Sequence, residues 1–222
     1  MEVQAGDILH VRRLNRYRIR WRIFYEAQDL KALIFATVVL SRTVASNGET
    51  PKGWFAAGSH PKEYEMSLDR TGAHGGNACA SLKSVVAETG GFGTLMQMFK
   101  ADDYRGKRVR MSGYVKSKEA SDWAGLWMRV DGAKKEETLA FDNMQDRAIK
   151  GTPDWKKYEI VLDVPESSEM VALGLLLSGK GQVWMDDLQF GVVGKDVPTT
   201  GRTMAGAASG AAKTPLNLNF EE

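Results

Sequence analysis

The stretch that decides the fold is GQVWMDDLQF, residues 181–190. Gly179 and Gly181 predict a turn in front of it, because glycine adopts turn conformations at little cost. The side chains spaced to face a core from a β-strand are Val183, Met185 and Leu188. The paired acid Asp186 and Asp187 interrupts this alternation, which predicts a bulge or a cation site in the strand that closes the sheet.

The same period of two runs through residues 52–193, with glycine-rich or charged turns between the segments. In 107–118 and 125–132 apolar and polar side chains alternate, whereas 170–179 is apolar on both faces and predicts a central strand. The predicted strands are 51–58, 64–69, 76–84, 92–100, 107–118, 125–132, 138–145, 155–165, 170–179 and 181–190, the first two forming a pair. This pattern predicts an all-β, antiparallel two-sheet jelly-roll sandwich of about ten strands.

The net charge of residues 47–222 excludes a basic nucleic-acid-binding domain. The chain has 30 Lys and Arg against 28 Asp and Glu. Residues 1–46 contain eight of the basic residues and four of the acids, which leaves 22 basic and 24 acidic side chains in 47–222. We therefore expect no nucleic-acid partner for the folded part of the chain.

The first 46 residues differ from the rest. Residues 30–46 join a lysine, a short apolar run and Val-Ala-Ser, as in a secretory signal peptide, and the run is too short for a stable membrane span. Residues 1–29 are then a misannotated or disordered extension. Two alternatives remain open: an uncleaved anchor, and a basic arm at 12–22 for nucleic acid or a membrane surface. The expected location is periplasmic or secreted, or cytoplasmic if 30–46 is not a working signal.

The domain boundaries follow from composition. Residues 47–193 form the predicted jelly-roll sandwich, and 194–214 form a flexible linker of small residues. Residues 215–222 are either a last edge strand or the start of a truncated module.

Several segments together resemble a known family. They are GW (53–54), Tyr64, LKS (82–84), LMQMF (95–99), YRGKRVRMSGYVK (104–116), GLWMRVDG (125–132), FDNMQDRAIKGTPDWKKYEIVLDVP (141–165) and GQVWMDDLQF (181–190). The chain resembles bacterial galactose-binding-like β-sandwich domains, which are related to carbohydrate-binding modules and are often labelled transcriptional regulators. The resemblance implies a non-catalytic ligand-binding fold, although no helix-turn-helix pattern supports the regulator label. One departure is that NFE, expected before GW, stands at 219–221.

One polar sheet face has the residue types that sugar binding needs, a flat aromatic ring for stacking and planar hydrogen-bonding groups. The candidate ligand-binding residues are Trp127, Arg129, Asp142, Asn143, Gln145 and Trp123. The alternative is that Trp127 packs under a loop and that Arg129 pairs with Asp131 or Asp142. The expected partner is a carbohydrate or a protein ligand.

A structural calcium ion is the only expected cofactor, with Asp186, Asp187 and Asp69 as candidate ligands, because calcium prefers oxygen ligands in loops at a sandwich end. The alternative is that these acids cap nearby amides. Cys79 is the single cysteine and its apolar neighbours predict a buried residue.

No catalytic motif stands out. The sequence has no G-x-S-x-G, H-E-x-x-H or phosphate-binding loop, and its carboxylates do not single out an acid/base pair. The sequence therefore favours a non-catalytic extracytoplasmic module that binds carbohydrate through one sheet face. The alternative is a protein-interaction or regulatory module without sugar binding.

Overall fold

The structure is a computed structural model, and it describes residues 48–134, 137–203 and 217–220. The predicted signal peptide and N-terminal extension lie outside these residues. Over the described residues the chain forms twelve strands and two short 3-10 turns, η1 (Pro61–Glu63) and η2 (Gln145–Arg147). In this part of the chain no helix has the length and apolar character needed to cross a membrane.

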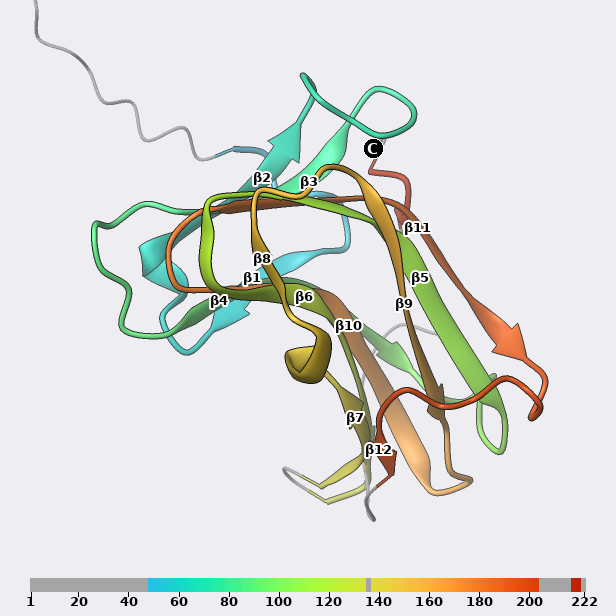
Figure 1. Cartoon of the computed structure of the whole chain (residues 1–222). Coiled ribbons are helices and arrows are strands. Elements are labelled where there is room, and N and C mark those ends of the chain that lie inside the picture. The colour runs from blue at the N-terminus through green and yellow to red at the C-terminus, as the bar shows by residue number, and fades with distance from the viewer. Residues whose placement is uncertain (1–47, 135–136, 204–216, 221–222) are drawn as a thin grey trace, which may run out of the picture. The chain divides into compact units, whose positions relative to one another are not determined.

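The strands form two antiparallel sheets that pack face to face (Figure 1). Sheet A contains, in spatial order, β1 (Phe55–Gly58), β4 (Phe92–Lys100), β10 (Ser168–Ser178), β6 (Ala120–Gly132), β7 (Thr138–Asp142) and β12 (Arg202–Thr203), and β8 (Ile149–Gly151) also pairs with β6. Sheet B contains β2 (Tyr64–Asp69), β3 (Cys79–Ser84), β11 (Gln182–Val193), β5 (Arg108–Lys118) and β9 (Lys156–Asp163). The predicted all-β sandwich is confirmed.

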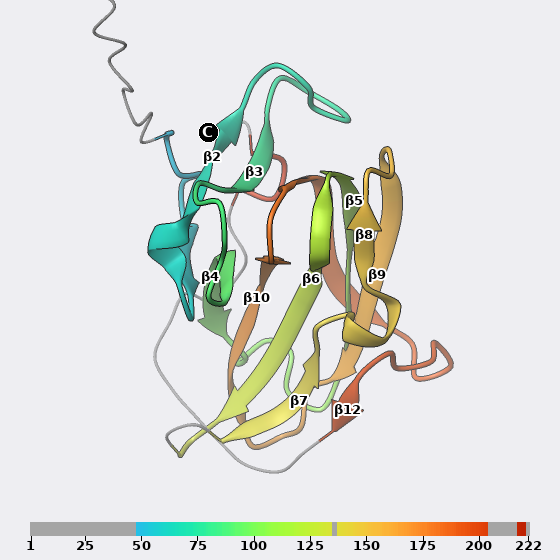
Figure 2. The same cartoon turned by 60° about the vertical axis from the view of Figure 1, so that its left-hand side comes forward.

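Alternation along the strands explains how the two sheets meet. In β5, Val109 and Met111 are fully buried between the sheets, while the intervening Arg110 is exposed on the outer side. In β6, Leu126 and Met128 are likewise fully buried. Strand β10 lies in the middle of sheet A, between β4 and β6, and is buried on both faces as its apolar sequence predicts (Figure 2).

The stretch GQVWMDDLQF (181–190) forms most of β11. Val183 and Met185 are fully buried, and the turn before the strand has Gly179 and Gly181 at φ values of 80° and 121°. The register of β11 against β5 shifts between Asp186 and Gln189, so the bulge predicted at the paired acid is confirmed.

Three local predictions are wrong. Segments 51–58 and 64–69 do not pair, because β1 pairs with β4 in sheet A while β2 pairs with β3 in sheet B. Strand β7 stops at Asp142, where the carboxylate accepts the backbone N–H of Met144 and turns the chain. The segment that follows, predicted as a loop, includes β8.

The predicted linker is also partly wrong. Residues 194–203 belong to the sandwich: Thr200 bonds the backbone of Val161, and β12 pairs with β7. The composition of the segment does not predict these contacts, because backbone pairing and a few anchor contacts hold it in place. Residues 204–214 lie outside the described residues.

The 194–203 segment brings a cation to the surface of sheet B. Arg108 donates to both carboxylate oxygens of Asp163, at 3.1 and 2.9 Å, and Lys195 donates to one of them at 2.9 Å. The hydrogen bond from Arg108, together with Lys195, holds the pKa of Asp163 at about 2 instead of its usual 3.8. The carboxylate is therefore more easily ionised in the folded chain than in the unfolded chain.

This pair predicts an acid-sensitive contribution to stability. A lowered folded-state pKa stabilises the fold above the unfolded pKa, and the contribution disappears as pH falls from about 4 to 2. With the side chain of Asp163 29% exposed, solvent screening limits the loss to about 1 kcal/mol. Urea unfolding at pH 5, 4, 3 and 2 should show this extra loss in the native chain and not in Asp163→Asn. Equal pH slopes for both chains would contradict the assignment.

Candidate functional site

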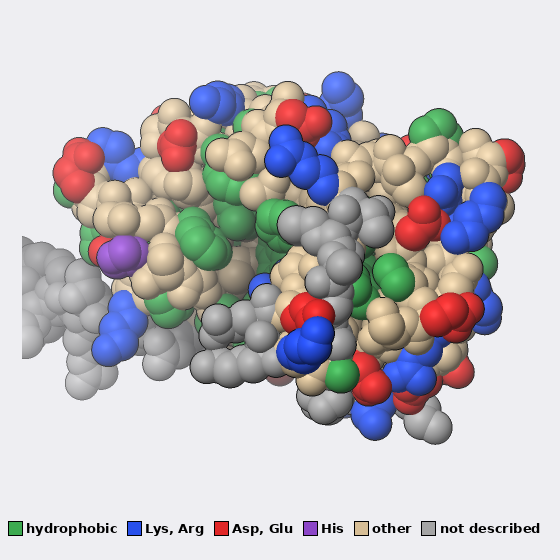
Figure 3. Space-filling model, turned by 90° about the horizontal axis from the view of Figure 1, so that it is seen from below, with side chains coloured by type: hydrophobic (Ala, Val, Ile, Leu, Met, Phe, Trp, Pro, Cys, Tyr) green, Lys and Arg blue, Asp and Glu red, His purple; other side chains and the backbone are tan. Residues whose placement is uncertain are grey.

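The outer face of sheet A has an apolar centre. Cross-strand pairing places Met96 of β4, Gly174 of β10 and Trp127 of β6 in one row. A separate apolar cluster on this face consists of Met96, Trp127, Ala172 and Leu176, with Ala57, Phe92, Met98, Trp123 and Phe141 packed around it. Figure 3 views this side of the molecule and shows hydrophobic side chains gathered between polar and charged ones.

Trp127 forms part of this apolar centre. The indole lies on the outer side of the sheet, as predicted, but the residue is only 7% exposed. Its Nε1 donates to the Thr94 hydroxyl at 2.7 Å, and a Cβ at Gly174 would lie 2.9 Å from the same nitrogen. The ring therefore extends across β10 above the glycine. This agrees with the alternative that Trp127 is packed, although the ring packs on a strand and not under a loop.

Arg129 also follows the alternative. Its guanidinium pairs with Asp131 two residues further along β6, at 2.8 Å. Trp123 lies on the same face and is half-buried against the apolar cluster, and its indole nitrogen has no hydrogen-bond partner within the described residues. Trp127 belongs to the apolar centre and Trp123 packs against it, so with Arg129 bound to Asp131 these residues do not form an open binding surface by themselves.

The other three predicted residues come together at the edge of sheet A. A pocket of about 500 Å³ lies where the end of β7 meets the segment leading into β12. Its lining residues are Phe141, Asp142, Asn143, Gln145, Asp146, Thr200, Gly201 and Arg202. We call this the β7–β12 pocket.

Two consecutive turns give the β7–β12 pocket its shape. Asp142 accepts the N–H of Met144 at 2.8 Å, and Asn143 accepts the N–H of Gln145 at 3.3 Å. Met144 takes up a left-handed conformation with φ of 57° and is fully buried. A buried side chain between two short polar turns fixes Asn143 and Gln145 at the rim.

Some polar groups of the pocket are already hydrogen-bonded within the protein, and others are available to a ligand. Asp142 is 6% exposed and bonds Arg147 at 2.6 Å, so its carboxylate is occupied. Asp146 bonds the same guanidinium at 2.8 Å. Within the described parts of the chain, the side chains of Gln145 and Arg202 have no hydrogen-bond partner and are exposed. The pocket can therefore offer an amide and a guanidinium beside the half-buried ring of Phe141.

Sequence reasoning missed Phe141 and Arg202. Phe141 stands in the predicted strand next to Asp142, and its place opposite Arg129 on the outer face follows from the register of β7 against β6. That register depends on where the strand begins, which a single sequence shows poorly. Arg202 lay in the predicted linker, where no pattern distinguishes it.

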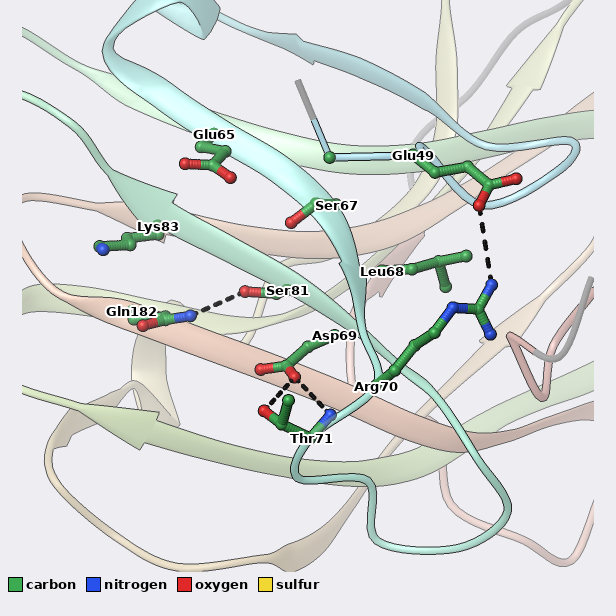
Figure 4. A pocket seen from close by; sticks show the side chains of 11 residues that line it. Glu49, Glu65, Ser67, Leu68, Asp69, Arg70, Thr71, Ser81, Lys83 and Gln182 are labelled. Carbon is green, nitrogen blue, oxygen red and sulfur yellow. Dashed lines mark hydrogen bonds and ion pairs between the residues drawn. The ribbon is translucent and has the colours of Figure 1, made fainter. Parts of the chain in front are cut away.

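A second pocket, of about 520 Å³, lies on the outer face of sheet B (Figure 4). Its polar side chains largely bond one another: Gln182 donates to Ser81 at 2.9 Å, and Asp69 accepts from the hydroxyl of Thr71 at 2.6 Å. Its lining includes no aromatic residue. The β7–β12 pocket is thus the better candidate, because it adds an aromatic ring to unpaired polar groups.

The candidate calcium ligands are occupied by protein donors. Asp186 is 1% exposed and accepts three backbone N–H groups, from His74, Gly75 and Asp187. Asp187 bonds the His74 ring at 2.6 Å, and Asp69 accepts from Trp184 as well as Thr71. Burial raises the pKa of Asp186. The donor set therefore fits the amide-capping alternative better than calcium, and among the described residues no three acidic, histidine or cysteine side chains form a metal-binding group.

Cys79 is fully buried in β3, as predicted. Burial raises the pKa of its thiol to about 12. The side chain is therefore a small packing residue and not a reactive thiolate.

The chain is similar to several solved structures and to a curated protein. No protein-family profile matches the chain. Among solved structures, the CBM22-1 xylan-binding domain from Paenibacillus barcinonensis is 19% identical, covers 66% of this chain and 90% of its own, and has a TM-score of 0.44. The C-terminal family 22 carbohydrate-binding module of Clostridium thermocellum Xyn10B is 14% identical, covers 69% and 98%, and has a TM-score of 0.47.

A curated relative is much more similar in sequence. It is called uncharacterized HTH-type transcriptional regulator YbfP, from Bacillus subtilis (strain 168), and is 49% identical over 172 residues. Its name carries the regulator label that the resemblance in sequence implied. The match covers 77% of this chain and 57% of the relative, so the chain spans little more than half of the length of the curated protein to which it is similar.

Proposed function

We propose that the chain is a non-catalytic module that binds a carbohydrate in the β7–β12 pocket. The observation that carries this proposal is that the Phe141 ring lies at one pocket with the side chains of Gln145 and Arg202, which have no hydrogen-bond partner among the residues that the structure describes. A saccharide presents apolar ring faces and closely spaced hydroxyls, so it needs an aromatic surface and planar hydrogen-bonding groups together. Asn143 lines the same pocket, and its side-chain amide would add a donor.

The carboxylates of the pocket support binding better than hydrolysis. A glycosidase needs one carboxyl group as an acid and a second at a set distance as a base or nucleophile. Asp142 and Asp146 both bond the guanidinium of Arg147. Since one cation engages both groups, they serve to hold the turn after β7.

A second candidate function is ligand sensing within a regulator. It is favoured by the regulator name of the relative that is 49% identical. In this reading the same pocket would bind an effector, and another part of a longer protein would act on the signal. The predicted extracytoplasmic location belongs to the first reading and stays a prediction, because residues 30–46 lie outside the described structure.

A glycan array probed with the labelled full chain tests the proposal, followed by calorimetry with the strongest oligosaccharide found. Phe141→Ala should weaken binding about tenfold, because a stacking surface is lost. Asn143→Ala should weaken it by a smaller factor. Gln182→Ala, which alters the sheet B pocket, is the matched control and should leave the affinity unchanged.

The array also separates the two functions. A folded chain that binds no glycan at all would favour the regulatory reading with a different effector. Glycan binding that survives Phe141→Ala but is lost in Gln182→Ala would place the site on sheet B and would contradict the β7–β12 assignment. Circular dichroism on each variant ensures that a loss of binding is not a loss of fold.

A further inference from the structure

The end of the described chain packs into the core beside β1. Phe220 is fully buried, and its ring centroid lies 5.4 Å from that of Trp54. Trp54 itself is 6% exposed and follows a turn in which its N–H bonds the carbonyl of Pro51. An aromatic side chain from the C-terminal region therefore completes the core next to the first strand of sheet A.

Hydrogen bonds to its backbone carbonyls hold the same segment at two further points. The N–H of Leu188, within the β11 bulge, donates to the carbonyl of Leu218 at 3.2 Å. The indole Nε1 of Trp54 donates to the carbonyl of Asn217 at 3.3 Å. The bulge matters here, because a register shift releases the Leu188 N–H from the ladder between β11 and β5.

These contacts have the features of peptide recognition. One buried aromatic anchor fills an apolar cleft, and backbone carbonyls on its N-terminal side accept hydrogen bonds from the receptor. The exposed Asn219 lies between the anchor and the bonded residues. The segment 217–220 belongs to neither sheet. The packing of Phe220 and the hydrogen bonds to Leu218 and Asn217 connect it to the body.

The sequence separates this segment from the body. Thirteen residues, 204–216, stand between β12 and Asn217, and eight of them are alanine, glycine or serine. Asn217 and Trp54 are 163 residues apart. A short segment with its own anchor, joined through a long connection, has the arrangement from which segment exchange between copies arises.

We propose that the cleft formed by Trp54, Leu188 and their neighbours is a peptide-binding site. Its ligand is the Asn-Leu-Asn-Phe segment 217–220, supplied by the same chain or by a second copy. In a single copy the connection keeps the segment at a high effective concentration, so its own tail occupies the site. At high protein concentration the segment of another copy takes its place.

A fluorescent peptide with the sequence of residues 215–222, PLNLNFEE, tests the site in the full-length chain. The Phe220→Ala chain keeps its tail but lacks the anchor, so it should bind the peptide saturably in an anisotropy titration. Its affinity should be at least tenfold higher than that of the native chain, where the resident segment competes. A peptide carrying the same Phe→Ala change should bind neither chain.

Asn219→Ala is the matched control in the chain, because this exposed side chain leaves the anchor in place; it should exclude the peptide as the native chain does. If Phe220→Ala does not fold, Phe220→Leu retains an apolar anchor and takes its place in the same titration. Equal peptide binding by native and anchor-weakened folded chains would overturn the proposal. The experiment uses no glycan, so its outcome is independent of the β7–β12 pocket.

A second measurement tests exchange between copies. Light scattering coupled to gel filtration should show a dimer whose share grows with the concentration of the native chain. Phe220→Ala should lower that share, while Asn219→Ala should not. A dimer equally abundant in Phe220→Ala, or a native chain that stays monomeric at millimolar concentration, would refute exchange through this segment.

Discussion

The Phe220→Ala chain should unfold with a free energy about 3–5 kcal/mol below that of the native chain, the usual cost of removing a buried phenylalanine side chain. Phe220 is fully buried against Trp54, which is itself 6% exposed. Truncation leaves a cavity beside the indole and removes the anchor of the whole segment. Urea unfolding followed by tryptophan fluorescence measures the difference.

The neighbouring Asn219 supplies the comparison. Its side chain is exposed, so Asn219→Ala should change the free energy of unfolding by no more than about 0.5 kcal/mol. If Phe220→Ala were as mild as Asn219→Ala, the terminal segment would contribute little to the core. The sandwich would then be complete without it.

The second large effect is expected at Asp186. Its carboxylate, 1% exposed, accepts the N–H groups of His74, Gly75 and Asp187 at 2.7, 3.0 and 2.8 Å. Asp186→Ala leaves these donors without their acceptor, and a buried unsatisfied donor is costly. We expect a loss of about 3 kcal/mol in the free energy of unfolding. Amide exchange in residues 70–77 should become faster, because the loop loses its attachment to β11.

Asp187→Asn tests whether the buried position or the local charge matters. Asp187 is more exposed, with 41% of its side chain accessible, and its contact with the His74 ring should be worth less than about 1 kcal/mol. Similar losses in both variants would show that the carboxylate of Asp186 has no special role. A loss confined to Asp186→Ala would confirm that it anchors the loop.

Most of the body could be predicted because its strands alternate. Val109 and Met111 on one side of β5, against Arg110 on the other, specify both a strand and the face that packs inward. The bulge at Asp186 was also predictable, because two acids cannot both follow the alternation of a buried strand. The pairing partners of β1 and β2 were not predictable, because alternation within a segment does not show which of the two sheets it joins.

The candidate site was predicted in part. Asp142, Asn143 and Gln145 do line one pocket, because a polar run directly after a strand forms a turn at the edge of a sheet. Trp127 and Arg129 lie on the predicted face but are engaged by Thr94 and Asp131. The sequence predicts that a side chain points away from the core, but it does not show which neighbouring residue covers that side chain.

The sequence by itself determined the class of fold, the inward faces of the long strands and the place of the bulge, since each depends on neighbours one or two residues away. The tertiary structure alone decided that Arg202 joins Phe141 at one pocket and that Phe220 fills the cleft at Trp54. The physical reason is distance along the chain. Local alternation limits what a strand can do, whereas contacts between residues far apart depend on which sheet edges meet once the whole core is closed.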